Sequence, residues 1–390
     1  MSIDVIRARA ETPGCARVLH FNNAGSALPP VPVLAAVQEH LAREAEIGGY
    51  EAADEAAARV ERAYDAIAAM LNCDRSEIAL VENATRAWDM AFYALRFEPG
   101  DRILTGRAEY ASNVIAVLQV AERTGAKVEL VPDDEHGQMD VAALRGMMDE
   151  RVKLVALTQV PTNGGLVNPA AEVGAVARGA GVPFLLDACQ SAGQMPLDVE
   201  AIGCDMLSAT GRKYLRAPRG TGFLYVRRTW IERLDPPFLD LHAATWTAPG
   251  RYEVRRDARR FENWESYVAG RVGLGVAVDY ALGWGLGAIR DRVTALADAL
   301  RARLAALPGV AVHDKGALRC GIVTFTVAGE EAASVQRRLR AGGINASVSA
   351  AEHARLDMEA RGLPALIRAS VHYYNTEEEI DRFCAALVTR

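Results

Sequence analysis

The sequence has few cysteines, and none of them stands in a metal-binding or disulfide pattern. Six cysteines are scattered over 390 residues, without a C-x-x-C pair or a His/Cys cluster of zinc spacing. Isolated cysteines in a cytoplasmic chain are mostly small buried hydrophobic residues. We therefore expect no disulfide framework and no metal site.

Long apolar runs are also missing. No stretch approaches the roughly 18 apolar residues that a membrane helix needs, and the first ten residues lack the apolar region of a signal peptide. The net charge of −6 argues against nucleic acid as a main partner. Half of the residues are hydrophobic, which is enough for a large core. We expect a cytoplasmic globular protein without a nucleic acid or membrane partner.

No G-x-G-x-x-G follows the first predicted strand, which argues against a nicotinamide-binding enzyme. Instead, strands and helices alternate from about residue 78 to 226, a rhythm that predicts a mainly parallel sheet covered by helices. Glycine-separated strands and helices near the C-terminus predict a compact α+β unit. The expected division is an N-terminal segment (1–20), a large α/β domain (21–265) and a small C-terminal domain (266–390).

A lysine and an acid stand out in this pattern. Lys213 lies in a turn of small residues between two apolar runs, and Asp187 ends the apolar run that begins at Val182. This order is typical of pyridoxal phosphate (PLP) enzymes, in which the lysine forms a Schiff base with the cofactor and the acid pairs with its pyridinium nitrogen. On these residues alone, an ordinary surface lysine in a loop remains the alternative.

Other polar residues also fall where predicted strands end. Ligands gather at the carboxyl ends of the strands in parallel sheets. Asn83 can cap the helix after the strand 78–81, and the N–H groups of that helix would form an anion site. The polar residues at or just after successive strand ends are Thr85, Tyr110, Gln159, Asp187, Gln190 and Lys213.

Three further features suggest substrate contacts. Arg368 lies within an otherwise apolar strand, where an arginine is costly unless paired. It could clamp a substrate carboxylate or form an internal salt bridge. Tyr50, on a glycine loop, is a candidate substrate contact. The arginine-rich run 251–260 is either a solvated face or a rim that attracts an acidic substrate.

Four motifs together resemble the class V aminotransferase group of fold-type I PLP enzymes. This group also holds cysteine desulfurases, isopenicillin N epimerase-like proteins and the C–S lyase of ergothioneine synthesis. The resemblance covers nearly the whole chain and implies the fold-type I architecture, with a seven-stranded-type sheet in the large domain. The motifs are A-T-R at 84–86, D-A-C-Q at 187–190, T-G-R-K at 210–213 and R-A-S-V-H-Y-Y-N-T-E-E-E-I-D at 368–381.

The resemblance also implies roles for single residues. Lys213 would hold PLP and remove the substrate's α-proton, Asp187 would pair with the ring nitrogen, and Tyr110 would stack on the ring. Arg368 would clamp the α-carboxylate, and the early loop at Ala24 would face the substrate. A homodimer with a shared active site is implied as well. The remaining implied cofactor contacts are Gln159 and Gln190 at the ring oxygen or imine, and Ala84, Thr85, Arg86, Thr210 and Arg212 at the phosphate.

The reaction type is less closely fixed. Cysteine desulfurases carry a persulfide-forming cysteine on a loop before the arginine strand, and residues 347–364 contain no cysteine. Sulfur relay through a cysteine persulfide is therefore not expected. The segments F-N-N-A-G-S (21–26), I-G-G-Y (47–50) and R-R-F-E-N-W-E (259–265) most resemble the C–S lyase and epimerase-like branch of the family. This resemblance implies β-elimination at the C–S bond of a cysteine conjugate or sulfoxide. The alternatives are an aminotransferase, an amino-acid epimerase and a non-catalytic binding module with the same fold.

Overall fold

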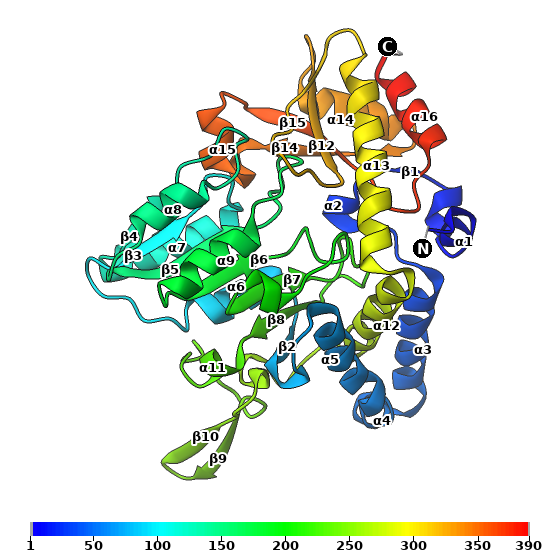
Figure 1. Cartoon of the computed structure of the whole chain (residues 1–390). Helices are drawn as coiled ribbons and strands as arrows, with labels where there is room; N and C mark the ends of the chain where they lie inside the picture. The colour runs from blue at the N-terminus through cyan, green and yellow to red at the C-terminus, as the bar shows by residue number, and fades with distance from the viewer. Residues whose placement is uncertain (1–2, 389–390) are drawn as a thin grey trace.

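The computed structural model describes residues 3–388, and a seven-stranded sheet forms its centre (Figure 1). The strand order is β2-β8-β7-β6-β5-β3-β4, in which β8 runs antiparallel to both neighbours and the other pairs are parallel. The predicted mainly parallel sheet is therefore confirmed. The strands are β2 (Ile78–Val81), β3 (Arg102–Thr105), β4 (Lys127–Leu130), β5 (Val152–Thr158), β6 (Phe184–Asp187), β7 (Met206–Thr210) and β8 (Gly222–Val226).

Helices cover both faces of this sheet, which explains why its central strands are almost wholly apolar. Successive side chains of a strand point to opposite faces. Accordingly, Leu185 of β6 packs in one core and Leu186 in the other. The helices between the strands are α6 (Ala84–Phe92), α7 (Ala111–Thr124), α8 (Val141–Met147), α9 (Ala170–Gly179) and α10 (Val199–Ile202).

A group of helices flanks the sheet near β2. Helix α12 (Val268–Trp284) packs against α3 (Val31–Ile47) and α5 (Ala57–Leu71). Gly275 lets α12 approach α5 closely, because a Cβ there would lie 3.1 Å from the Cα of Ala63. A separate short helix, α4 (Gly49–Glu55), precedes α5, and the two meet at Ala56.

A second sheet lies at the top of Figure 1 and is antiparallel, in the order β11-β12-β15-β14. The N-terminal segment packs here too, since β1 (Leu19–His20) pairs with β13 (Ile344–Asn345). The domain division at residues 20 and 265 stays a prediction. The elements of this unit are β11 (Val310–Val312), β12 (Ile322–Val327), β14 (Ser347–Ala350), β15 (Ala365–Ser370), α13 (Leu286–Ala305), α14 (Ala332–Ala341), α15 (Arg355–Ala360), α16 (Glu377–Val388), with α1 (Val5–Ala10) and α2 (Asn23–Ser26) nearby.

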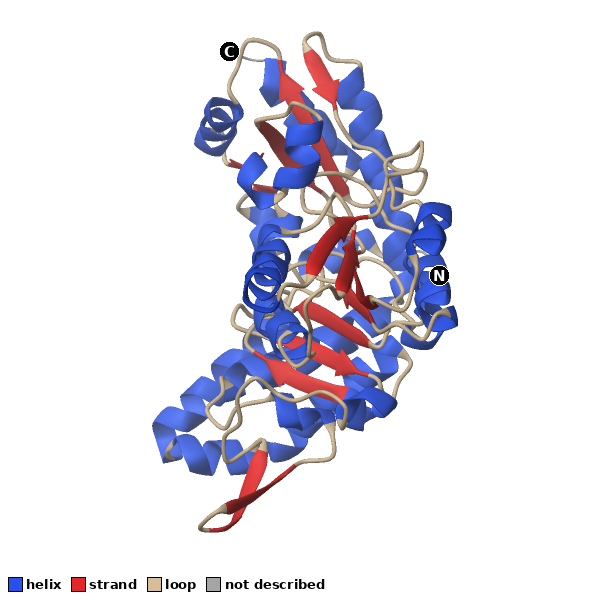
Figure 2. Ribbon diagram, turned by 90° about the vertical axis from the view of Figure 1, so that its left-hand side faces the viewer, coloured by secondary structure: helices blue, strands red, loops and turns tan. Residues whose placement is uncertain are grey.

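A two-stranded hairpin projects from the other end of the molecule (Figures 1 and 2). Its strands β9 (Ala244–Ala248) and β10 (Arg251–Val254) pair only with each other. The segment between β8 and this hairpin contains a short helix, α11 (Arg228–Ile231). The Pro249-Gly250 pair, a loop signal in the sequence, is the tip of this hairpin. The 3-10 helices are η1 (Pro13–Ala16), η2 (Arg75–Glu77), η3 (Ala258–Phe261) and η4 (Ala351–His353).

Within residues 3–388, no single helix has the length and apolar content needed to cross a bilayer. Helices α12 and α13 satisfy that test only when joined, and they are bent by 78° at their junction.

Candidate active site

A cavity of about 370 Å³ opens at the carboxyl ends of β5, β6 and β7. It lies where ligands of parallel sheets are expected. All predicted cofactor contacts except Arg86 and Gln159 line it, so the strand-end argument located the cavity correctly. The lining residues are Asn83, Ala84, Thr85, Tyr110, Asn113, Thr158, Val160, Thr162, Asp187, Cys189, Gln190, Thr210, Arg212 and Lys213.

Lys213 and Asp187 are both buried in this cavity. Burial lowers the pKa of Lys213, which favours the neutral amine that a Schiff base or a proton acceptor requires. Burial raises the pKa of Asp187. Two hydrogen bonds and the charge of Lys213 oppose that shift: Asp187 Oδ1 accepts from the Cys189 N–H at 2.8 Å, and Oδ2 accepts from Asn113 Nδ2 at 2.8 Å. These two bonds fix the carboxylate where it can receive a further N–H donor.

The N-terminus of α6 forms another wall. The side chain of Asn83 accepts the N–H of Arg86 at 2.9 Å, as the sequence predicted for a cap. The N–H groups of Ala84 and Thr85 lie in the first turn, where helices have no internal acceptors and attract anions. Strand β8 comes close at Gly222, because a Cβ there would lie 2.9 Å from the carbonyl carbon of Asn83.

Gln190 connects the cavity to the early loop. Its Nε2 donates to the backbone oxygen of Ala24 at 3.1 Å, while its Oε1 is buried without a partner. The oxygen therefore lacks a donor that a bound molecule could supply. Arg212 donates to the backbone oxygen of Gly25. Ala24 does not line the cavity itself; its carbonyl orients Gln190.

Arg368 lies on β15 and is buried. Its Nε donates to Ser347 Oγ at 3.0 Å, and its Nη1 donates to the hydroxyl of Thr162 and to its backbone oxygen at 3.1 Å. Burial lowers the pKa of Arg368 to about 10. No carboxylate among residues 3–388 pairs with it, so the internal salt bridge considered from the sequence is not formed. Its charge lies near that of Lys213, and a carboxylate ligand would compensate it.

Two predicted cofactor contacts, Arg86 and Gln159, do not line the cavity. Arg86 donates to Asn263 Oδ1 at 2.9 Å, and its guanidinium stacks 3.9 Å from the ring centroid of Phe238. Successive side chains of a helix are about 100° apart, so Arg86 and Thr85 face different sides of α6. Gln159 is buried next to the cavity but does not line it. Thr162, three residues later, reaches the cavity instead.

Tyr50 lies outside this cavity as well. It is 74% exposed and lines a separate open hollow of about 650 Å³ together with His242, Trp264 and Ser266. Tyr50 therefore does not contact the cavity of its own chain, and its role as a substrate contact stays a prediction. A helix turn after a glycine pair gives no information on which side of the molecule it will lie.

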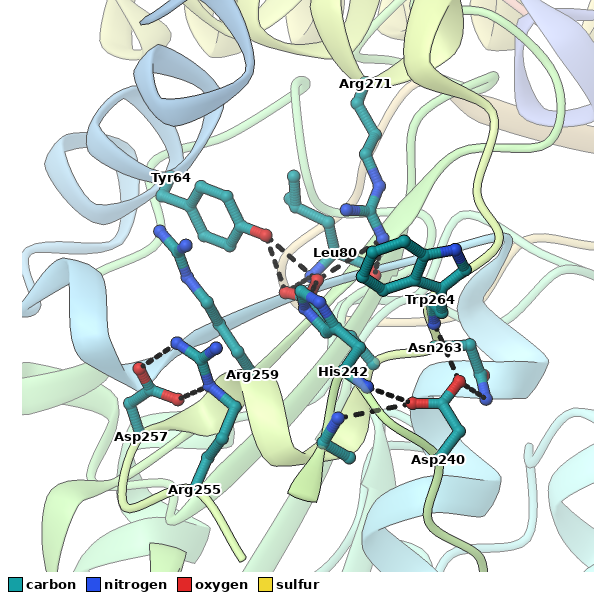
Figure 3. A network of polar contacts seen from close by, with 12 residues as sticks. Tyr64, Leu80, Asp240, His242, Arg255, Asp257, Arg259, Asn263, Trp264 and Arg271 are labelled. Carbon is teal, nitrogen blue, oxygen red and sulfur yellow. Dashed lines mark hydrogen bonds and ion pairs between the residues drawn. The ribbon is translucent and has the colours of Figure 1, made fainter. Parts of the chain in front are cut away.

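A buried polar network supports this hollow (Figure 3). The carboxylate of Glu262 accepts the hydroxyl of Tyr64 at 2.8 Å and the N–H of Leu80 at 2.9 Å. His242 and Arg271 approach the same carboxylate at 3.2 and 3.3 Å. The segment before α12 is therefore anchored to two other elements: to α5 through Tyr64 and to β2 through Leu80. The buried first residue of the loop 262–266 is thus tied to three neighbouring elements of the protein.

Sequence reasoning missed several side chains of the cavity. Asn113 follows Tyr110 by one helical turn, and this i, i+3 spacing was a usable signal. Cys189 lies between the predicted residues Asp187 and Gln190, and its thiol contacts Lys213. Burial raises the pKa of this thiol. Thr162 had no signal, because the path of the loop after β5 cannot be read from its residues.

The donor set fits PLP. The cavity offers a buried amine, a carboxylate for a ring nitrogen, an unpaired acceptor at Gln190 and a helix N-terminus for a phosphate. These features, on a mainly parallel sheet, define a PLP-dependent enzyme of fold-type I. A family model described as "Aminotransferase class-V" matches residues 19–383. The chain belongs to this family, and its cofactor is PLP.

Curated and solved relatives agree with this assignment. A probable cysteine desulfurase of Xylella fastidiosa strain 9a5c is 31% identical over 95% of this chain and 90% of its own length. The apo structure of a cysteine desulfurase from Thermococcus onnurineus NA1 superposes with a TM-score of 0.91 at 26% identity, covering 99% of this chain and 98% of the other.

A third relative contributes chemical information. The cystine C-S lyase C-DES, solved with its reaction product cysteine persulfide, has a TM-score of 0.86 at 26% identity over 97% of this chain and 99% of its own. Another structure of C-DES holds glycine covalently linked to the PLP cofactor, with a TM-score of 0.87 at 26% identity over 98% and 99% of the two chains.

Proposed function

We propose that the protein cleaves the C–S bond of a cysteine conjugate or its sulfoxide by β-elimination. One observation favours elimination over sulfur transfer to the enzyme: the segment between β14 and β15, residues 351–364, contains no cysteine. The similarity to proteins named cysteine desulfurase and cystine C-S lyase supports a sulfur-containing amino acid as substrate.

Arg368, Lys213 and Asp187 each have a separate role in this reaction. Arg368 binds the α-carboxylate of the substrate and so orients its Cα–H bond. The amine of Lys213, whose pKa burial lowers, takes the α-proton. Asp187 holds the ring nitrogen in its protonated form. When bound, PLP supplies the electron sink that makes the α-proton acidic.

The atoms balance without an added oxidant or reductant. The Cα–H proton goes to Lys213, the Cβ–S bond breaks, and sulfur leaves with the bonding electron pair as a thiol or sulfenic acid after protonation. The released enamine takes up water to give pyruvate and ammonia. An enzyme of this type therefore needs no amino acceptor.

Desulfuration of free cysteine is the second candidate, because the curated relatives carry that name. It requires a thiolate to accept sulfur. Cys189 is the only cysteine among the cavity-lining residues of the described chain, and burial raises its pKa, which disfavours the thiolate. Desulfuration would yield alanine, whereas elimination yields pyruvate.

The decisive assay incubates the PLP-loaded protein with S-substituted cysteines, their sulfoxides and free cysteine. Pyruvate and ammonia in equal amounts, without an added 2-oxo acid, support the lyase. Alanine formation from cysteine would replace it with a desulfurase, and strict dependence on a 2-oxo acid would replace it with an aminotransferase. Inversion at Cα without release of either product would indicate an epimerase.

The active form is a homodimer with a shared site. Tyr50, Trp264 and Ser266 line a separate open hollow, an arrangement suited to completing the cavity of a second copy. Light scattering should give twice the 42.0 kDa of one chain. Mixing an inactive Lys213→Ala protein with an inactive Ser266→Trp protein should restore part of the activity; a monomeric mass and no restoration would refute the shared site.

A further inference from the structure

Behind the cavity lies a second buried carboxyl group that the proposed reaction does not use. Glu109 is 3% exposed and ends the loop before α7. Its Oε1 accepts the N–H of Thr158 at 2.9 Å, and its Oε2 accepts the hydroxyl of Thr158 at 2.5 Å. The N–H of Gly106 is a further backbone donor. All of its hydrogen bonds are thus made inside the protein.

Glu109 joins the two parts of the site that should face the cofactor ring. Thr158 is the last residue of β5 and pairs in register with Asp187 at the end of β6. Tyr110 follows Glu109 directly, and Asn113, one turn further along α7, donates to Asp187. The carboxyl group therefore fastens the segment that carries Tyr110 and Asn113 to the strand end beside Asp187.

The charge of Glu109 acts on the same place. Burial is the main cause that raises the pKa of Glu109 to about 7, the like charge of Asp187 adds to it, and the hydrogen bonds from Thr158 and Gly106 oppose it. Among charged side chains, Asp187 shifts the pKa of Glu109 most. Near neutral pH, a proton on or off Glu109 changes the field behind the carboxylate of Asp187.

We propose that Glu109 is a positioning residue that acts through Asp187, and that its ionisation couples cofactor binding to pH. An ionised Glu109 makes a protonated ring nitrogen on Asp187 more favourable. By reciprocity, a bound pyridinium draws the proton from Glu109. The inference depends on the PLP site and not on which reaction the enzyme performs.

Three variants separate charge from geometry. Glu109→Gln removes the charge but keeps both bonds, since its oxygen accepts the Thr158 N–H and its amide donates to the hydroxyl. Thr158→Val removes one bond and keeps the carboxyl group. Glu77→Gln is a control for the loss of a buried carboxylate elsewhere: Glu77 accepts backbone N–H groups of Asp74 and Arg228, remote from the cavity, and its glutamine can accept only one of them.

The measurement is the dissociation constant of PLP for the apoprotein from pH 5.5 to 8.5, followed by absorbance. The ratio of wild-type to Glu109→Gln affinity should be close to one at the acid end, where Glu109 carries a proton. It should rise to roughly tenfold at the alkaline end, the equivalent of one pKa unit of coupling. The Glu77→Gln ratio should stay flat.

A second probe tests the route through the ring nitrogen. With 1-deaza-PLP, in which a CH group replaces that nitrogen, the pH-dependent difference between wild type and Glu109→Gln should vanish. A flat affinity ratio with PLP, or an equal loss at every pH, would overturn the proposal in favour of packing alone. If Glu109→Gln does not fold, the PLP affinity of Thr158→Val must itself still rise with pH, because that variant keeps the carboxyl group; an affinity that does not rise would overturn the proposal too.

Discussion

Arg368→Met should lower kcat/KM while the free energy of unfolding stays equal or rises. The guanidinium of Arg368 is buried without an acid partner, and its pKa falls to about 10. At 1.36 kcal/mol per pKa unit, this shift corresponds to about 3 kcal/mol against the charged form. At pH 7 the group is charged both folded and unfolded, so the native state carries this cost.

Methionine has a similar length and no charge, so the variant recovers that energy. It loses the donors to Ser347 Oγ and the Thr162 backbone oxygen, which costs about 1–3 kcal/mol. The net expectation is a free energy of unfolding equal to or above that of the wild type, measured by urea denaturation of the apoprotein.

The kcat/KM of Arg368→Met should fall, in contrast to its stability. A charge-assisted hydrogen bond is worth about 1.5–3 kcal/mol, and a guanidinium can form two with a carboxylate. Loss of both predicts a fall in kcat/KM of roughly 10²- to 10⁴-fold. The affinity for PLP should change little, because Arg368 does not line the cofactor cavity. A clearly less stable variant with unchanged kcat/KM would show that Arg368 is a structural residue.

Three other substitutions test separate parts of the site. Lys213→Ala should abolish turnover and prevent borohydride from fixing PLP covalently to the chain; full turnover would refute its role. Cys189→Ala should retain most lyase activity, measured as pyruvate release, whereas complete loss would point to sulfur transfer through this thiol. Gly222→Ala should lower stability by about 1–3 kcal/mol and weaken PLP binding, because its Cβ would lie 2.7 Å from the Ala209 oxygen; a thermal melt and a PLP titration measure both.

Much of the large domain was readable because its signals are local. The strands β2, β5 and β8 are apolar runs bounded by turn residues, and their positions follow from composition. The carboxyl ends of parallel strands meet at one edge of a sheet, so residues such as Asp187 and Gln190 could be grouped without coordinates.

The misses share one physical origin, which is that they depend on contacts distant in sequence. The pairing of Leu19 with Ile344 joins segments from opposite ends of the chain, and no local pattern encodes it. The burial of Glu109 depends on the path of the loop after β3. Likewise, Thr162 rather than Gln159 reaches the cavity because of how the loop after β5 folds against Arg368.

The charges in and beside the cavity explain why Lys213, Asp187 and Arg368 form one site. Lys213 and Arg368 are buried bases whose pKa values burial lowers, and Asp187 is a buried acid whose pKa burial raises. Each shift records a charge that lacks enough compensation in the protein alone. A ligand with a protonated ring nitrogen supplies the opposite charge at Asp187, and a second ligand that carries a carboxylate supplies it at Arg368. Without ligands, the site therefore has uncompensated charges, and PLP and an α-amino acid carry the groups that compensate them.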